Sequence, residues 1–176
     1  MRDEPRADAA ITWRVALVRD AFYGHDAESR LRATLAECRE LGADVALLPE
    51  IPLHPWSPAT KEARAEDAEE PGGPRERLQR DAPPEAGIAL IGGTIRATED
   101  GRRENTALVI TASGELHATY AKLHIPEEPG FWETSHYSAG TEPREPIRRL
   151  RQRELPFGGQ ICSDVNRPMG SHLLAA

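Results

Sequence analysis

Residues 13–50 read WRVALVRDAFYGHDAESRLRATLAECRELGADVALLPE and decide the fold. The apolar run at Trp13–Val18 is typical of a strand buried on both faces of a sheet, and Val45–Leu48 is a second short apolar run. Between the two runs, residues 27–41 carry apolar side chains at helical spacing, at Leu31, Leu35, Cys38 and Leu41. Strand, helix and strand in this order predict a βαβ unit with parallel strands.

More strands are expected downstream, and together with the first unit they indicate an α/β fold. The predicted strands are Ile88–Ile95, Asn105–Thr111, Glu115–Tyr120 and Glu154–Ile161, the last one ending at Cys162. Ala112-Ser113-Gly114 predicts a hairpin turn between the second and third of these strands. A short helix is expected near residues 75–80, and a long loop over residues 123–146.

Residues 61–70, KEARAEDAEE, are charged all round. This pattern is typical of a solvated helix or a mobile surface segment without a function of its own. An acidic interaction module that uses this segment is a weaker alternative.

Composition narrows the class of protein. The chain has 176 residues and a net charge of −7, with a pI of about 5.4, whereas nucleic-acid-binding proteins usually carry a basic stripe. No apolar run reaches the length of a membrane span, and residues 1–12 are expected to form a disordered leader without the apolar core of a signal peptide. The two cysteines fit a reduced, cytoplasmic protein. We therefore expect one domain over residues 13–176 that binds neither nucleic acid nor membranes.

Three reactive side chains follow predicted strands, where ligands of such sheets usually bind. Each has an ordinary explanation: Cys162 as a small buried hydrophobe, Glu50 and Lys122 as solvated strand ends. Together they make chemical sense, because a carboxylate can take the proton of a thiol and a lysine can stabilise the oxyanion that forms when the thiol attacks an amide. The backbone N–H of Ser163 is a natural second oxyanion donor, and His124 is a weaker candidate base.

Three motifs resemble the signature regions of the nitrilase (carbon–nitrogen hydrolase) superfamily: LLPE at 47–50, YAKLHIP at 120–126 and GGQICSD at 158–164. The resemblance implies an αββα sandwich that commonly dimerises. It implies Glu50 as general base, Lys122 as oxyanion stabiliser and Cys162 as nucleophile. It also implies a second glutamate that orients the lysine, and Glu133 matches that position best.

The loop EEPGFWETSHYSAG at 127–140 resembles the branch that hydrolyses N-carbamoyl amines, such as N-carbamoylputrescine amidases. Glu127 and Glu128 would suit a cationic substrate tail, or they are merely solvated. Trp132 and Tyr137 are further candidates for lining the pocket. A small amide or N-carbamoyl substrate is expected, with no metal or organic cofactor.

Members of this superfamily usually continue for roughly another hundred residues after the cysteine, whereas Ala176 ends this sequence. We therefore expect a sandwich that is incomplete at the C-terminus, with open strand edges. A truncated, inactive remnant of such an enzyme is the alternative to an active hydrolase.

Overall fold

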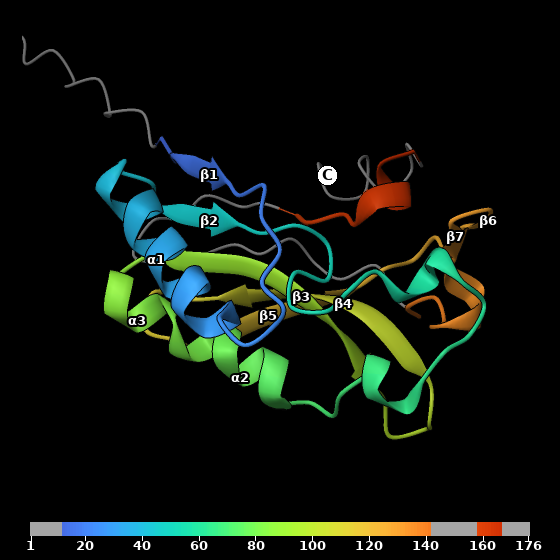
Figure 1. Ribbon diagram of the computed structural model, residues 1–176. Coiled ribbons are helices and arrows are strands. Elements are labelled where there is room, and N and C mark those ends of the chain that lie inside the picture. Colours follow the sequence, from blue (N-terminus) through green and yellow to red (C-terminus); the bar gives the residue numbers. More distant parts are fainter. Residues whose placement is uncertain (1–11, 142–157, 167–176) are drawn as a thin grey trace, which may run out of the picture.

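A five-stranded mixed sheet forms the centre of the protein (Figure 1). The computed structural model describes residues 12–141 and 158–166. The strands lie in the order β1-β2-β3-β4-β5; β1 to β3 are parallel, and β4 is antiparallel to both of its neighbours. Their bounds are Val15–Leu17, Val45–Leu47, Ala89–Ala97, Arg103–Ile110 and Leu116–Ala121. The predicted βαβ unit and the hairpin between β4 and β5 are therefore present.

Helices cover one face of this sheet. They are α1 (Ala27–Glu40), α2 (Pro74–Asp81) and α3 (Pro83–Ala86), and Figure 1 shows them on the same side of the strands. Successive strand residues point to opposite faces. The main core therefore joins Leu31 and Leu35 of α1 to every second residue of the sheet, among them Leu90 and Leu108.

The opposite face of the sheet is also apolar. A separate cluster on it contains Val45, Ala89 and Val109, with Trp13 and Ile91 packed against them. The α1 side and this side thus use alternate residues of the same strands, as expected for a sheet that is meant to be covered twice.

Strand β1 departs from the prediction, since it was expected to be buried on both faces. Val15 is 47% exposed and Leu17 is 73% exposed, because β1 pairs on one side only, with β2. Helix α1 begins after Asp26, whose side chain makes no capping hydrogen bond, and it is followed by Gly42 at φ +79°. A left-handed conformation of this kind is the usual reason for a glycine behind a helix.

The prediction for residues 61–70 is wrong. The segment is neither a solvated helix nor all surface: only Ala65–Asp67 form a 3-10 turn, and the side chains of Asp67 and Glu69 are buried. Glu69 forms an isolated parallel bridge to Arg96 at the end of β3. The segment is therefore part of the folded body.

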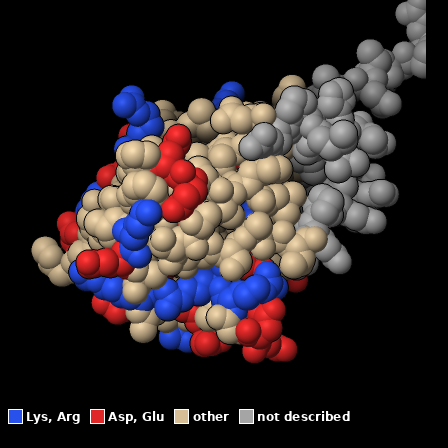
Figure 2. Space-filling view, turned by 90° about the vertical axis from the view of Figure 1, so that its right-hand side faces the viewer, with Lys and Arg blue, Asp and Glu red and all other residues tan. Residues whose placement is uncertain are grey.

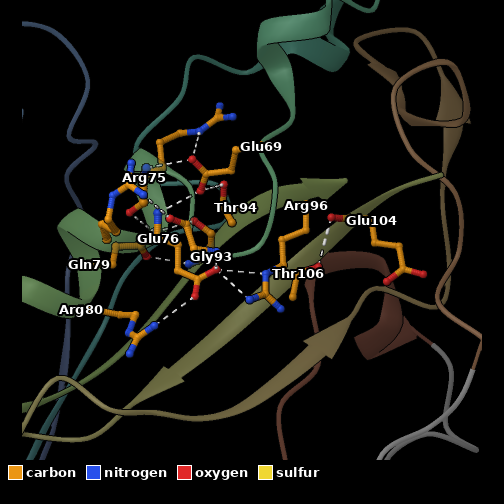
Figure 3. A network of polar contacts seen from close by, with 12 residues as sticks. Glu69, Arg75, Glu76, Gln79, Arg80, Gly93, Thr94, Arg96, Glu104 and Thr106 are labelled. Carbon is orange, nitrogen blue, oxygen red and sulfur yellow. Dashed lines mark hydrogen bonds and ion pairs between the residues drawn. The ribbon is translucent and has the colours of Figure 1, made fainter. Parts of the chain in front are cut away.

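A network of polar contacts holds this segment against α2 and β3 (Figure 3). Glu69 accepts hydrogen bonds from the Thr94 hydroxyl at 3.0 Å and from the backbone N–H of Arg75 at 2.8 Å. Glu76, which is 1% exposed, pairs with Arg96 at 2.7 Å. Because each buried carboxylate has donors, its burial is tolerated.

Charges of both signs also alternate on the surface. Figure 2 shows basic side chains gathered along the lower margin of one face, with acidic side chains between them and a broad uncharged area above. Exposed pairs such as Arg32 with Glu85 and Arg102 with Asp100 show the same alternation. Such exposed pairs contribute little to stability.

The last predicted strand, Glu154–Ile161, is only partly within the described residues. Its described part, residues 158–161, belongs to no strand, and Cys162 opens a 3-10 turn over Cys162–Asn166. Most of the expected leader and the region after residue 166 lie outside the described residues. Within the described part of the chain, no helix is both long and apolar enough to cross a membrane.

Candidate active site

The sheet topology brings three polar side chains to one edge. Glu50 follows β2 and Lys122 follows β5, and these two strands run in the same direction. Asn105 lies near the start of β4, which runs the opposite way, so it reaches the same edge. The backbone N–H of Lys122 donates to the carbonyl of Asn105 at 2.8 Å, which fixes the two side chains next to each other.

Lys122 bridges two carboxylates. Its Nζ lies 2.9 Å from Glu50 Oε1 and 2.7 Å from Glu133 Oε2. The side chains of Lys122 and Glu133 are fully buried, while that of Glu50 is 20% exposed. Burial acts to lower the pKa of Lys122, but the hydrogen bonds to Glu133 and Glu50 outweigh it, so the pKa is raised and the amine stays charged. Burial raises the pKa of Glu133 despite its pairing with Lys122.

Asn105 and Tyr137 complete this network. Asn105 Nδ2 donates to Glu50 Oε1 at 2.6 Å and lies 3.3 Å from the Tyr137 hydroxyl. Burial and a hydrogen bond to Glu133 raise the pKa of Tyr137, so the phenol remains protonated. Tyr137 was expected as a candidate lining residue, whereas its hydroxyl here supports the two acidic residues from behind. Asn105 was not expected at all.

Cys162 carries a free thiol in an unusual backbone conformation. It has φ +48°, and Ile51, directly after Glu50, has φ +51°. Side chains with a Cβ rarely adopt this left-handed region. Although the residue as a whole is exposed, loss of solvent around the thiol raises its pKa, and the charge of Glu50 raises it further. Lys122 and the Ser163 N–H act in the opposite direction.

Glu50 and Cys162 line one cavity of about 510 Å³, together with Asn105. The rest of its wall is mainly the apolar second face of the sheet, including Val45, Leu47, Ile91 and Val109. Lys122 does not line this cavity; it lies behind Glu50. The arrangement places a thiol and a carboxylate on a shared apolar space, with a buried ammonium in contact with that carboxylate.

Two other predicted substrate contacts lie away from the cavity wall. Trp132 belongs to β7 (Phe131–Trp132), where Lys61 Nζ lies 4.0 Å from the centre of its ring. Glu128 belongs to β6 (Glu127–Glu128) and is exposed. Neither residue is among those that line the cavity.

Ser163 and Asp164 follow the cysteine and join its turn to the end of β5. The Ser163 hydroxyl donates to the carbonyl of His124, while the side chain of Asp164 is buried. The imidazole of His124 pairs with Asp164 at 2.8 Å. Asp164 was not expected, although it stands in the GGQICSD motif.

No three His, Cys, Asp or Glu side chains converge on a metal-binding geometry within residues 12–141 and 158–166. The chemistry that this site offers therefore has to be considered from a thiol, two carboxylates, an amine and backbone N–H groups.

Comparisons with known proteins agree with this arrangement. A hydrolase from Schizosaccharomyces pombe is 30% identical over 142 residues, which are 78% of this chain and 42% of that protein. The chloroplastic omega-amidase of Arabidopsis thaliana is 30% identical over 65% of this chain and 33% of its own length. The chain thus spans less than half the length of these relatives.

Solved structures show the same fold. A carbon–nitrogen hydrolase from Helicobacter pylori G27 superposes with a TM-score of 0.73 at 20% identity, over 93% of this chain and 54% of the other. An amidase from Nesterenkonia sp. AN1 in complex with acrylamide gives 0.73 at 21% identity, over 93% and 60%. The nitrilase-type α/β fold is therefore confirmed. The family model for carbon–nitrogen hydrolases matches residues 15–176, and the chain belongs to this family.

Proposed function

We propose that this chain carries the active site of an amidase that acts through a thioester on Cys162. The observation that supports this most is the buried, charged chain of hydrogen bonds from Glu133 through Lys122 to Glu50, which ends at the cavity that holds the thiol. A buried ion network of this kind is costly unless each charge is paired, and perturbed groups beside a cavity are typical of catalytic sites.

The raised pKa of Cys162 favours a general-base mechanism. Because solvent loss and Glu50 both disfavour the thiolate, the resting residue is a thiol at neutral pH. Glu50 is the acceptor for its proton as Sγ attacks the carbonyl carbon. The carbonyl π electrons move to oxygen, and Lys122 and the Ser163 N–H are the proposed donors to that oxyanion.

The second half of the reaction regenerates the enzyme. The oxyanion collapses, the C–N bond breaks, and the amine leaves with the proton that Glu50 took. Water then attacks the thioester while Glu50 accepts its proton, and Cys162 leaves as the thiol when that proton returns. Glu133, Asn105 and Tyr137 serve to hold Lys122 and Glu50 in place.

The proposed substrate is a small amide. The cavity wall is mainly apolar, which suits a neutral group, and two of the similar proteins are omega-amidases. An N-carbamoyl amine with a cationic tail is the second candidate. Glu127 already pairs with Lys61 at 3.8 Å, which leaves exposed Glu128 as the charge available to such a tail.

Acrylamide is a suitable probe, because it is itself an amide and adds to the active-site cysteine of the Nesterenkonia amidase. We would treat the full chain with acrylamide, locate the adduct by peptide mass, and measure ammonia release from small amides and N-carbamoyl amines in parallel. We expect modification of Cys162, and loss of both signals in Cys162→Ala. Cys38→Ala, which removes the other thiol, is the matched control. Ammonia release that persists in Cys162→Ala would refute the mechanism.

A further inference from the structure

Asp164 lies two residues after Cys162, is 1% exposed, and has no part in the reaction above. A buried carboxylate needs several donors to offset its loss of hydration. The identity of those donors indicates what the residue is for.

One carboxylate oxygen binds the chain that follows Lys122. Asp164 Oδ1 accepts from the backbone N–H groups of Leu123 at 3.2 Å and His124 at 2.8 Å, and lies 2.8 Å from Nδ1 of the His124 ring. These are the first two residues after the lysine. This oxygen therefore holds the end of the segment that presents Lys122.

The other oxygen binds both sides of the site. Asp164 Oδ2 accepts from the Tyr120 hydroxyl at 2.7 Å and from the backbone N–H of Ile161 at 3.2 Å. The N–H of Asp164 also donates to the Ile161 carbonyl at 3.0 Å. Asp164 thus closes the turn that contains Cys162 and also binds β5 two residues before Lys122.

We propose that Asp164 is a positioning residue that locks the turn bearing Cys162 to the strand end bearing Lys122. The inference rests on the proposed function, since it assumes that the thiol and the ammonium act on the same carbonyl group. The left-handed backbone of Cys162 needs such a lock, because an unrestrained turn would relax to an unstrained conformation. A displacement of about 1 Å between two reacting groups can lower a rate on the order of a hundredfold.

Asp164→Asn removes this lock with little change in size. The asparagine amide can keep its oxygen toward Leu123 and His124, but its NH2 group then faces the N–H of Ile161, donor against donor. Alternatively it keeps the Ile161 bond and loses the other two backbone bonds. Either way the turn and the strand end are no longer held by one group.

Glu76→Gln is the matched control. Glu76 is also 1% exposed and accepts from backbone and side-chain donors, Gly72 N–H and Arg96, but it lies in the network of Figure 3, among residues that do not line the cavity. Both variants neutralise one buried carboxylate. A general loss of stability therefore affects both, whereas a loss of positioning affects Asp164→Asn alone.

The experiment measures two quantities on each folded full-length protein. One is kcat and KM for a small amide; the other is the pH midpoint for alkylation of Cys162 by iodoacetamide, with Cys38 followed separately by peptide mass. For Asp164→Asn we expect kcat to fall about tenfold or more, with KM changed by less than about threefold. We expect the alkylation midpoint to move down toward that of a free thiol, because a loosened Cys162 leaves the burial and the Glu50 charge that raise its pKa.

Turnover and thiol reactivity thus change in opposite directions, which unfolding alone would not produce. Wild-type kcat and midpoint in Asp164→Asn, or changes equal to those of Glu76→Gln, would overturn the proposal. If Asp164→Asn does not fold, Tyr120→Phe, which removes one of the bonds, decides by the same shift of midpoint. If the wild-type chain hydrolyses no amide, the proposed function fails, while the midpoints still test the lock.

Discussion

Replacing Lys122 by methionine removes the only charge between Glu50 and Glu133 while keeping the length of the side chain. Two charged hydrogen bonds, at 2.9 and 2.7 Å, disappear. Glu50 is 20% exposed and keeps Asn105 as a donor, so water and the amide compensate it in part. Glu133 is fully buried, and its Oε1 atom already has no hydrogen-bond partner among the described residues.

The cost therefore comes mainly from Glu133. Leaving a buried charge without its partner typically lowers the free energy of unfolding by about 3–5 kcal/mol. That is a large part of the roughly 5–15 kcal/mol that stabilises an ordinary domain. We expect Lys122→Met to lose about 3–5 kcal/mol at pH 7.5, and the double variant Lys122→Met/Glu133→Gln to recover at least about half of that loss.

The loss must also depend on pH. Without Lys122, the pKa of Glu133 in the folded state rises further, because burial already raises it and the ammonium opposed that rise. The folded state then holds a proton that the unfolded state releases above about pH 4.3, so the variant becomes less stable relative to wild type as pH rises, by up to about 1.4 kcal/mol per pH unit, until the folded pKa is reached.

Urea unfolding of wild type, Lys122→Met and the double variant at several pH values between 4.5 and 8 measures these quantities, where the range is chosen to bracket roughly the ordinary carboxyl pKa and neutrality. The double variant should show no added pH dependence. A loss below about 1 kcal/mol at pH 7.5, or a loss that does not change with pH, would refute the view that Lys122 compensates a buried charge.

Three further outcomes follow from the geometry. Gly92→Ala should lower the free energy of unfolding by about 1–3 kcal/mol in a denaturant titration, because its Cβ would lie 1.9 Å from the buried Gln79 Oε1; wild-type stability would contradict this. Gly42→Ala should cost about 1 kcal/mol, because φ is +79° there; an increase in stability would show that the left-handed conformation is not required. The pH midpoint for alkylation of wild-type Cys162 should lie above that of a small free thiol, and Glu50→Gln should lower it, since the carboxylate raises the pKa of the thiol; an unchanged midpoint would remove Glu50 from the site.

Local patterns predicted much of the sheet. The apolar runs and the helical spacing of Leu31 and Leu35 depend on neighbours in sequence, so they correctly gave the βαβ unit and the family. The strand ends also correctly placed Glu50 and Lys122 at one edge. Their chemical roles, and that of Glu133, remain proposals, although the three side chains are hydrogen bonded in one chain.

Partners that come from distant segments could not be predicted. Asn105 reaches the site only because β4 runs against its neighbours, and its position depends on the register between β4 and β5. Asp164 binds residues about 40 positions earlier, so its role is not visible in the GGQICSD motif alone. Glu69 looked like part of a solvated charge run because its donors, such as Thr94, lie on another strand.

The backbone strain at Ile51 and Cys162 has a consequence for protein engineering. Each left-handed residue with a Cβ costs on the order of 1–3 kcal/mol, and both adjoin the proposed reacting groups. A screen that selects only for heat resistance would therefore favour substitutions that relax these two positions, and the variants it recovered would be more robust and less active. Stabilisation of this protein should leave residues 50, 51 and 162 fixed and search the helix-covered face of the sheet instead.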